Sequence, residues 1–317
     1  MKKYLINRLF IAIPTFFGIT LLVFIISYFA SGSPLELLLS NQNISEAEIE
    51  RQKIKLGLDQ PVYSQYFSWI GKLLIGDLGD SYRTMQPVMD LIIKGLGATA
   101  LLALTSVVIA CLIAIPLGIL SAKNQNKFWD NIAAFFSFFV TSTPSFFIAL
   151  IFLYVFSVQL KLLPIGGMHD VGSDFSIMSF LKHLIMPSVV LSLHMVGPLI
   201  QFTRSSMLEV ISEDYVRTAR AKGIKEITVT IKHILRNSLI PVVTYLGMEI
   251  PLLLGGAVVT EQIFSWPGIG NLLILSINTR DYPVIMGVTI IVALAVLIFN
   301  IITDLLYGFL DPRIRYD

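Results

Sequence analysis

Long apolar blocks dominate the sequence, and most of the charged residues lie between them. A transmembrane α-helix needs roughly 20 apolar residues to cross about 30 Å of hydrocarbon. Segments of this kind occupy residues 9–30, 99–120, 132–160, 184–203, 239–263 and 284–307. We therefore predict an all-α integral membrane protein with six transmembrane helices.

The overall composition supports a membrane protein rather than a soluble one. Hydrophobic residues make up 55% of the 317 positions, charged residues make up 14%, and the mean hydropathy is +0.77. A soluble domain needs more polar surface than this composition supplies. The formal net charge of +2 gives no indication of nucleic acid binding. Cys111 is the only cysteine, which excludes an intrachain disulfide. We expect one membrane domain covering residues 1–317.

Prolines interrupt two of the six blocks. The block 132–160 is longer than a span requires and contains Pro144, so we expect a kink there, or a short interfacial stretch before the span proper. The block 184–203 contains Pro187 and Pro198 and is the weakest of the six.

The first block has an apolar core longer than that of a secretory signal, and we expect it to remain as a span.

The distribution of Lys and Arg predicts the orientation. Residues 1–8, 121–131, 204–236 and 307–317 carry 14 of the 23 Lys and Arg residues in 63 positions, whereas the connections on the other side carry 9 in 114 positions. Positive residues accumulate on the cytoplasmic side of membrane proteins. We therefore expect both termini in the cytoplasm of a cell whose cytoplasmic membrane holds this multi-pass chain.

The segment 31–97, expected outside the cell, contains two helix signals. Ser45 and Glu48 have capping-box spacing and predict a helix over residues 46–56. After Pro61, an apolar stripe at helical spacing predicts a second helix, with Tyr66, Phe67, Ile70, Leu73 and Leu74 on the stripe. We expect this helix to lie on the membrane surface or to pack over the outer ends of the spans. Contact with a docking partner is the alternative.

The longest cytoplasmic connection, residues 204–236, is charged and amphipathic. Ser212 is a candidate N-cap for a helix from Glu213 to Lys222, which Gly223 would end. A second helix is expected over residues 225–235. One face of the first helix would present four residues suited to a groove on another protein, namely Tyr215, Thr218, Ala219 and Lys222. The alternative is a solvated basic loop that only fixes the topology.

The same connection carries a family resemblance. Residues 214–223 read Asp-Tyr-Val-Arg-Thr-Ala-Arg-Ala-Lys-Gly and residues 233–241 read His-Ile-Leu-Arg-Asn-Ser-Leu-Ile-Pro. This resembles the cytoplasmic loop of the dipeptide, oligopeptide and nickel branch of binding-protein-dependent ABC importer permeases. The likeness continues in residues 3–8, 57–61, 76–79, 264–268 and 311–316, and the order of these pieces is similar to that of the B-type subunit of the permease pair.

The resemblance implies a type I importer permease fold and a role for the helix before Gly223. In the wider family this loop begins Glu-Ala-Ala, where this chain has Arg217, Thr218 and Ala219, so the chain matches the peptide and nickel branch better. The helix would be the coupling helix that enters a cleft on a cytoplasmic ATPase. Its contact residues would be Asp214, Tyr215, Arg217, Thr218, Ala219, Arg220, Ala221, Lys222 and Gly223.

The resemblance also implies a set of partners. These are a second, homologous permease subunit, two cytoplasmic ABC ATPases, an extracytoplasmic peptide-binding protein and the surrounding lipid. The chain has no Gly-x-x-x-x-Gly-Lys-Ser/Thr phosphate loop, so ATP and Mg²⁺ are expected on the ATPases and no cofactor on this chain.

Polar residues within the spans are candidates for the translocation path. A carboxylate near the bilayer centre costs roughly 3 kcal/mol on insertion scales, so Glu249 and Glu261 should face either a water-filled path or a structural partner. We assign both to the path. We expect the nearby Pro241, Pro251 and glycines to make this helix more flexible. His194 is a further candidate, although a hydrogen-bonded interior histidine is the simpler interpretation.

Neither enzymatic chemistry nor a metal site is expected. The four histidines do not have metal-ligand spacing with Cys or paired carboxylates, and no nucleophile motif is present. The predicted function is that of a permease subunit importing dipeptides or oligopeptides. One alternative keeps the machinery and imports nickel or a metal chelate, and another is a secondary transporter driven by protons through Glu249.

Overall fold

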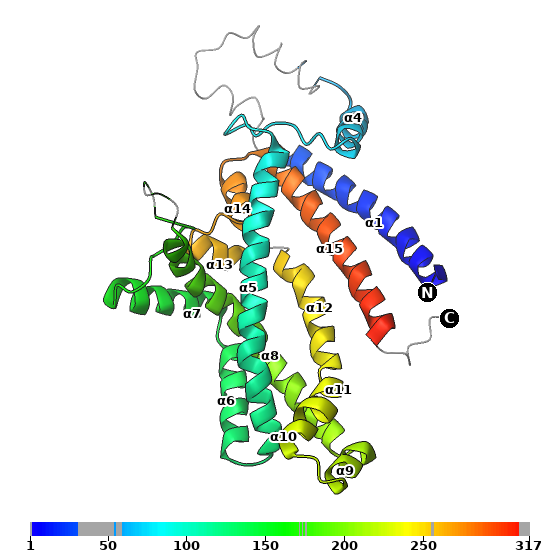
Figure 1. Cartoon of the computed structure of the whole chain (residues 1–317). Helices are drawn as coiled ribbons and strands as arrows, with labels where there is room; N and C mark the ends of the chain where they lie inside the picture. The colour runs from blue at the N-terminus through cyan, green and yellow to red at the C-terminus, as the bar shows by residue number, and fades with distance from the viewer. Residues whose placement is uncertain are drawn as a thin grey trace.

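The computed structural model describes residues 2–30, 54, 59–170, 172, 174, 176–254 and 257–310, and Figure 1 shows their arrangement. Within these ranges the chain is mostly helical. The helix predicted over 46–56 and the family motif at 311–316 lie outside the described residues.

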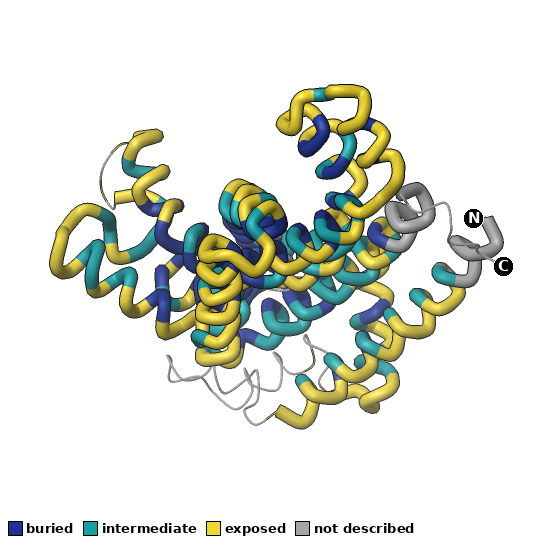
Figure 2. The backbone as a smooth tube through the Cα atoms, turned by 90° about the horizontal axis from the view of Figure 1, so that it is seen from below, coloured by how far each residue is buried: buried dark blue, intermediate teal, exposed yellow. Residues whose placement is uncertain are grey.

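Two long helices form the centre of the molecule. They are α5 (Val88–Lys123) and α8 (Ile177–Ile211), which run side by side over most of their length. Small residues of α5 allow the close approach, because a Cβ atom on Gly118 would lie 2.5 Å from Cβ of Thr203 on α8. Figure 2 shows that buried positions gather in the middle of the molecule and that exposed positions dominate its periphery.

Helix α8 is longer than the span predicted at 184–203. It continues through Pro187 and Pro198 without a break and extends eight residues beyond 203. Met207 in this extension is fully buried. Packing against the rest of the protein therefore stabilises the extension, as it does most helices in proteins. The least regular of the predicted spans is therefore the central helix of the protein.

The kink predicted at Pro144 is confirmed and is sharper than a bend within one helix. Helix α6 (Phe128–Ser142) ends, and α7 (Ser145–Phe152) continues as the π-helix η1 (Leu153–Gln159) at 98° to it. Thr143 adopts an extended backbone, with φ −92° and ψ 126°, as the residue before a proline prefers.

The predicted span 239–263 is wrong as a single helix. Helix α12 (Ile240–Leu254) ends, and α13 (Val258–Ile263) begins after Ala257, whose ψ of 47° is not helical. Two glycines precede Ala257 in the sequence, and glycine is a weak helix former. A further short helix, α14 (Ile269–Asn278), leads into α15 (Tyr282–Leu310).

Helix α1 (Lys2–Phe29) packs along α15 at one side of the molecule (Figure 1). Helix α4 (Val62–Leu74) covers the far end of α1, where the Tyr66 and Thr20 hydroxyls lie 3.0 Å apart. The rings of Phe24 of α1 and Tyr66 of α4 make an edge-to-face contact, with ring centroids 5.4 Å apart. The helix predicted after Pro61 is thus present and packs against a spanning helix, although Phe67 and Leu74 of its apolar stripe remain exposed.

In the part of the chain that the structure describes, four helices are long and apolar enough to cross a membrane, or five if the bent pair α6 and α7–η1 is one crossing. The shorter α12 covers most of the remaining predicted segment, residues 239–263. Several apolar helices therefore confirm a multi-pass membrane protein, while the number six rests on the sequence.

Candidate functional site

Helix α9 (Asp214–Ala221) follows α8 after a turn of two residues. Ser212 does not cap it, contrary to the prediction, because Ser212 is the C-cap of α8 and its hydroxyl donates to the carbonyl of Glu209 at 2.7 Å. Glu213, in an extended conformation, takes the N-cap position, and no side chain caps the helix. Asp214 lies in the first turn, where its charge favours the helix dipole.

Gly223 ends α9, as the sequence predicts. It has φ +75°, a left-handed conformation that costs other residues roughly 1–2 kcal/mol. The N–H of Gly223 donates to the carbonyl of Arg220 at 2.9 Å and the N–H of Ile224 to that of Ala219 at 3.4 Å. These two hydrogen bonds form a Schellman motif, which fixes the exit of the helix.

The inner face of α9 packs against its own chain. Val216 is 0% exposed and Ala219 is 5% exposed, and both belong to a cluster with Ala122 at the end of α5 and Met207 of α8. The cluster is completed by Val229 and Ile234 of η2 (Val229–Leu235), which lies between the short helices α10 (Glu226–Thr228) and α11 (Arg236–Ser238). Displacement of α9 would therefore disturb the cluster that it shares with η2 and the ends of α5 and α8.

This packing corrects one predicted contact. Ala219 does not share the outward face of α9 with Tyr215, Thr218 and Lys222, because its side chain is needed to fill the cluster beneath the helix. The other predicted residues of the helix are exposed, namely Asp214, Tyr215, Arg217, Thr218, Arg220, Ala221, Lys222 and Gly223.

Polar contacts hold the exposed side of α9 in place. The Tyr215 hydroxyl accepts a hydrogen bond from Asn237 Nδ2 at 2.7 Å. Arg220 pairs with Glu226 through Nη2 and Nε at 2.8 and 3.2 Å, which lowers the pKa of Glu226 below its ordinary value. Arg217 and Asp214 lie 3.5 Å apart on the surface, a pair of small energetic effect.

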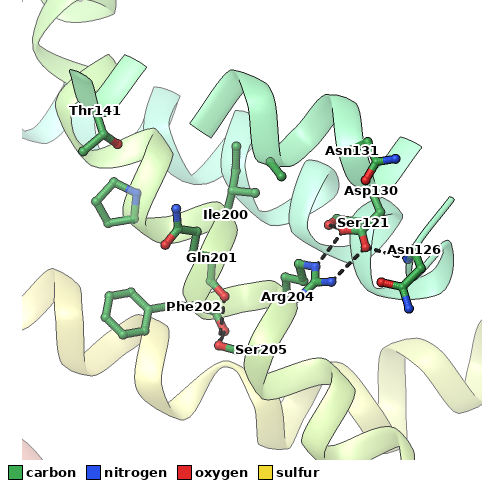
Figure 3. A pocket seen from close by; sticks show the side chains of 12 residues that line it. Ser121, Asn126, Asp130, Asn131, Thr141, Ile200, Gln201, Phe202, Arg204 and Ser205 are labelled. Carbon is green, nitrogen blue, oxygen red and sulfur yellow. Dashed lines mark hydrogen bonds and ion pairs between the residues drawn. The ribbon is translucent and has the colours of Figure 1, made fainter. Parts of the chain in front are cut away.

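A cleft of about 760 Å³ opens beside α8, on the side of α6. Its lower end holds a bidentate ion pair, in which Arg204 Nε and Nη2 donate to the two carboxylate oxygens of Asp130 at 2.7 and 2.8 Å (Figure 3). Asp130 is 4% exposed and also accepts from the Ser121 hydroxyl and from the Asn126 N–H. The other described lining residues are uncharged and include Asn131, Thr141, Gln201, Phe202 and Ser205.

Glu261, predicted on the path, is instead fully buried among hydrogen-bond donors. Its carboxylate accepts from the Thr99 hydroxyl at 2.5 Å and from the Asn271 N–H at 3.0 Å. Gly268 lies against it so closely that a Cβ atom there would be 2.2 Å from Oε1. In this structure Glu261 has the structural role that was the alternative, because its carboxylate is fully buried and accepts hydrogen bonds from its own chain.

Glu249 and His194 lie elsewhere. Glu249 is half-buried on α12, one turn from Tyr245, whose hydroxyl interacts with its carboxylate. His194 is exposed on α8 and is not the interior histidine of the simpler interpretation. The structure does not bring Glu249, Glu261 and His194 together.

Among the described residues, no group of three or more His, Cys, Asp or Glu is placed to hold a metal ion.

Sequence reasoning missed two acidic residues that organise the two ends of the molecule. Asp130 lies just before a predicted span and Asp281 lies in a short connection, so neither appears as a buried charge in a hydropathy pattern. Their partners, Arg204 and Ser81, are distant in sequence.

Two family models match the chain. Residues 114–316 match the family described as binding-protein-dependent transport system inner membrane component, and residues 1–103 match the N-terminal component of the same kind of system. Together the two matches cover most of the chain, including the bent pair, α8, α9 and the clusters around Asp130 and Glu261.

Several relatives align over nearly their whole length. The oligopeptide transport system permease protein AppB of Bacillus subtilis is 45% identical over 100% of both chains. The dipeptide transport system permease protein DppB of Escherichia coli K12 is 36% identical over 100% of this chain and 99% of that one. The glutathione transport system permease protein GsiC of Escherichia coli O6:H1 is 39% identical over 100% of both.

A solved structure shares the fold. The MetNI methionine ABC transporter, in inward-facing conformations, matches with a TM-score of 0.53 and 13% identity, covering 70% of this chain and 97% of the other. At this identity the likeness concerns the fold alone, and it agrees with the predicted type I importer permease architecture.

Proposed function

The chain belongs to the family of binding-protein-dependent transport system inner membrane components, and we propose that it is the permease subunit of an ATP-driven importer of dipeptides or oligopeptides. The relatives named above transport oligopeptides, dipeptides and glutathione, itself a short peptide, and each aligns with this chain from end to end. Peptide is therefore the substrate class that best accounts for the likeness.

One observation carries the proposed mechanism. Helix α9 has an exposed outer face and an inner face, Val216 and Ala219, that is packed against the ends of α5 and α8. An ATPase that holds the outer face in a groove would move the inner face with it. Because α8 is continuous from residue 177 to residue 211, that movement would reach the centre of the molecule.

The proposal implies a full set of partners. Two ABC ATPases would bind ATP and Mg²⁺ beneath the membrane, a second homologous permease would complete the path, and an extracytoplasmic binding protein would deliver the peptide. Helix α9, the α5–α6 connection and both termini would lie in the cytoplasm, which agrees with the concentration of Lys and Arg there.

The direct test is transport by the complete importer. The permease pair, the ATPases and the binding protein are reconstituted in proteoliposomes, and labelled dipeptides, tripeptides and Ni²⁺ are offered with and without ATP. We expect uptake of peptide that depends on ATP and on the binding protein. ATP-dependent uptake of Ni²⁺ but of no peptide would instead support the metal alternative, and uptake driven by a proton gradient without ATPases would overturn the proposal.

A further inference from the structure

Between residues 194 and 205, the uncovered positions of α8 lie along one stripe. Half of the positions between residues 194 and 205 are buried, and Leu199, Met195 and Val196 are 0% exposed. The uncovered positions along the stripe follow a spacing of three to four residues, at His194, Pro198, Gln201, Phe202 and Ser205. This spacing puts them on one face of the helix.

Three of the five stripe residues, His194, Gln201 and Ser205, are polar, although α8 is a candidate membrane span. Polar side chains in a span face a partner or a water-filled path, because lipid cannot satisfy their hydrogen bonds. From Pro198 downward the stripe forms one wall of the cleft, and Thr141 and Asn131 of α6 add to it (Figure 3).

The cleft offers both hydrogen-bond donors and acceptors. Gln201 uses one side-chain N–H to contact the Ser137 hydroxyl at 3.0 Å, which leaves its second side-chain N–H as a donor and its side-chain oxygen as an acceptor. The hydroxyls of Ser205 and Thr141 donate to backbone carbonyls of their own helices, so their oxygens can still accept. A peptide bond presents one donor and one acceptor, which this wall can match whatever the side chains are.

The charges of the cleft cancel. Among the described residues that line the cleft, Asp130 and Arg204 are the charged ones, and they neutralise each other through two short hydrogen bonds. Arg204 remains 31% exposed, whereas the Asp130 side chain is 5% exposed. Removing either partner would leave one uncompensated charge beside the cleft.

We propose that this cleft is the inner part of the peptide path and that the Asp130–Arg204 pair keeps it electrically neutral, so that acidic and basic peptides pass alike. This inference rests on the proposed function and adds to it the residues that contact the peptide backbone, Gln201, Ser205, Thr141 and Asn131. Asp130 and Arg204 are specificity-determining residues, because they set the charge that a passing side chain meets.

The decisive experiment compares two variants of opposite charge. Importers carrying Asp130→Asn or Arg204→Gln are given an equimolar mixture of Ala-Asp-Ala and Ala-Lys-Ala, and uptake of each is measured. We expect Asp130→Asn to shift the uptake ratio toward the acidic peptide and Arg204→Gln to shift it toward the basic one. One unit charge roughly 6 Å away in water changes the uptake of a singly charged peptide about threefold. Because the two peptides respond in opposite directions, each ratio should shift about tenfold.

A matched control separates this effect from loss of folding. Asp281→Asn removes a carboxylate that is equally buried, at 2% exposure, but lies at the opposite end of the molecule. It should change uptake of both peptides by the same factor. If Asp130→Asn and Arg204→Gln also leave the ratio unchanged, or shift it in the same direction, the inference is wrong. If the unaltered importer takes up neither peptide, the proposed function itself fails.

A second measurement does not depend on the ion pair. Gln201→Cys, within the predicted span 184–203, is introduced in a Cys111→Ser background, with Val108→Cys on the exposed side of α5 as its control. During ATP-driven turnover a membrane-impermeant thiol reagent should label Gln201→Cys several-fold faster than Val108→Cys, and saturating tripeptide with the binding protein should slow that labelling. Equal labelling of the two variants would place the stripe in lipid and overturn the inference.

Discussion

Asp281, the residue immediately before α15, accepts a hydrogen bond of 2.5 Å from the hydroxyl of Ser81, which lies 200 positions earlier in the chain. The same carboxylate accepts from the backbone N–H of Tyr82 at 3.0 Å. It thereby ties the turn after α4 to the corner between α14 and α15, at the end of the molecule far from α9 (Figure 1).

We expect Asp281→Ala to destabilise this end. Asp281 is 2% exposed, and its removal leaves the Ser81 hydroxyl and the Tyr82 N–H without their partner, at a cost of about 2–3 kcal/mol. The measurement is the unfolding temperature of the purified permease in detergent, which should fall by several degrees. The exposed Asp59→Ala is the control and should leave the unfolding temperature unchanged.

Gly223 provides a prediction about coupling. Its φ of +75° disfavours any residue with a Cβ atom, although there is open space around it. Gly223→Ala and Gly223→Trp should therefore both loosen the end of α9 and reduce the transport achieved per ATP hydrolysed, while the protein still inserts in the membrane. Gly223→Asn should retain most of the coupling, because asparagine tolerates this conformation better.

The control for Gly223 is Gly71 in α4. This glycine also has open space around it, but its φ is not positive. Gly71→Ala should leave coupling intact and should slightly favour the helix. If Gly223→Trp couples ATP hydrolysis to transport as well as the unaltered protein does, α9 does not act as a rigid element.

Much of the fold follows from the sequence, because the helices are long and their signals are local. Hydropathy finds α1, α5 and α15, Pro144 marks the bend after α6, and Gly223 marks the end of α9. The division between α12 and α13 was missed, since an apolar run continues through it and hides the break.

The site is less predictable, because it depends on contacts between distant residues. A carboxylate within an apolar block looks the same in sequence whether it lines a path or binds structural donors, and Glu261 binds Thr99, 162 positions away. The cleft is formed where α6 meets α8, and only the folded chain brings Asp130 to Arg204. Family resemblance identified α9 but could not show that Ala219 faces inward.

The inward position of Ala219 leads to the next prediction. Ala219→Leu adds bulk to the packed cluster that contains Val216 and Met207, and overpacking of this kind costs about 1–3 kcal/mol. We expect α9 to be displaced from α5 and α8 while its outer face stays unchanged. ATPase subunits should still co-purify with the permease, but ATP hydrolysis should no longer drive uptake.

The opposite face gives the matched variant. Thr218 is exposed, next to Ala219, and its hydroxyl donates only to the carbonyl of Asp214 at 2.9 Å. Thr218→Leu adds similar bulk without disturbing the cluster, and it should weaken ATPase co-purification instead. Loss of co-purification in Ala219→Leu with none in Thr218→Leu would reverse the assignment of the two faces.

Two glutamates with the same chemistry should respond differently to the same change. Glu261→Gln places an amide NH₂ group in a pocket whose other groups, the Thr99 hydroxyl and the Asn271 N–H, are donors. One acceptor is lost where no water can replace it, so this variant should unfold at a lower temperature and transport less of every peptide. Glu249→Gln, at a half-buried position on α12, should keep ATP-dependent uptake close to that of the unaltered importer. Abolition of uptake by Glu249→Gln, with normal ATP hydrolysis and unfolding temperature, would favour a proton-coupled mechanism and contradict the assignment of the driving force to the ATPases.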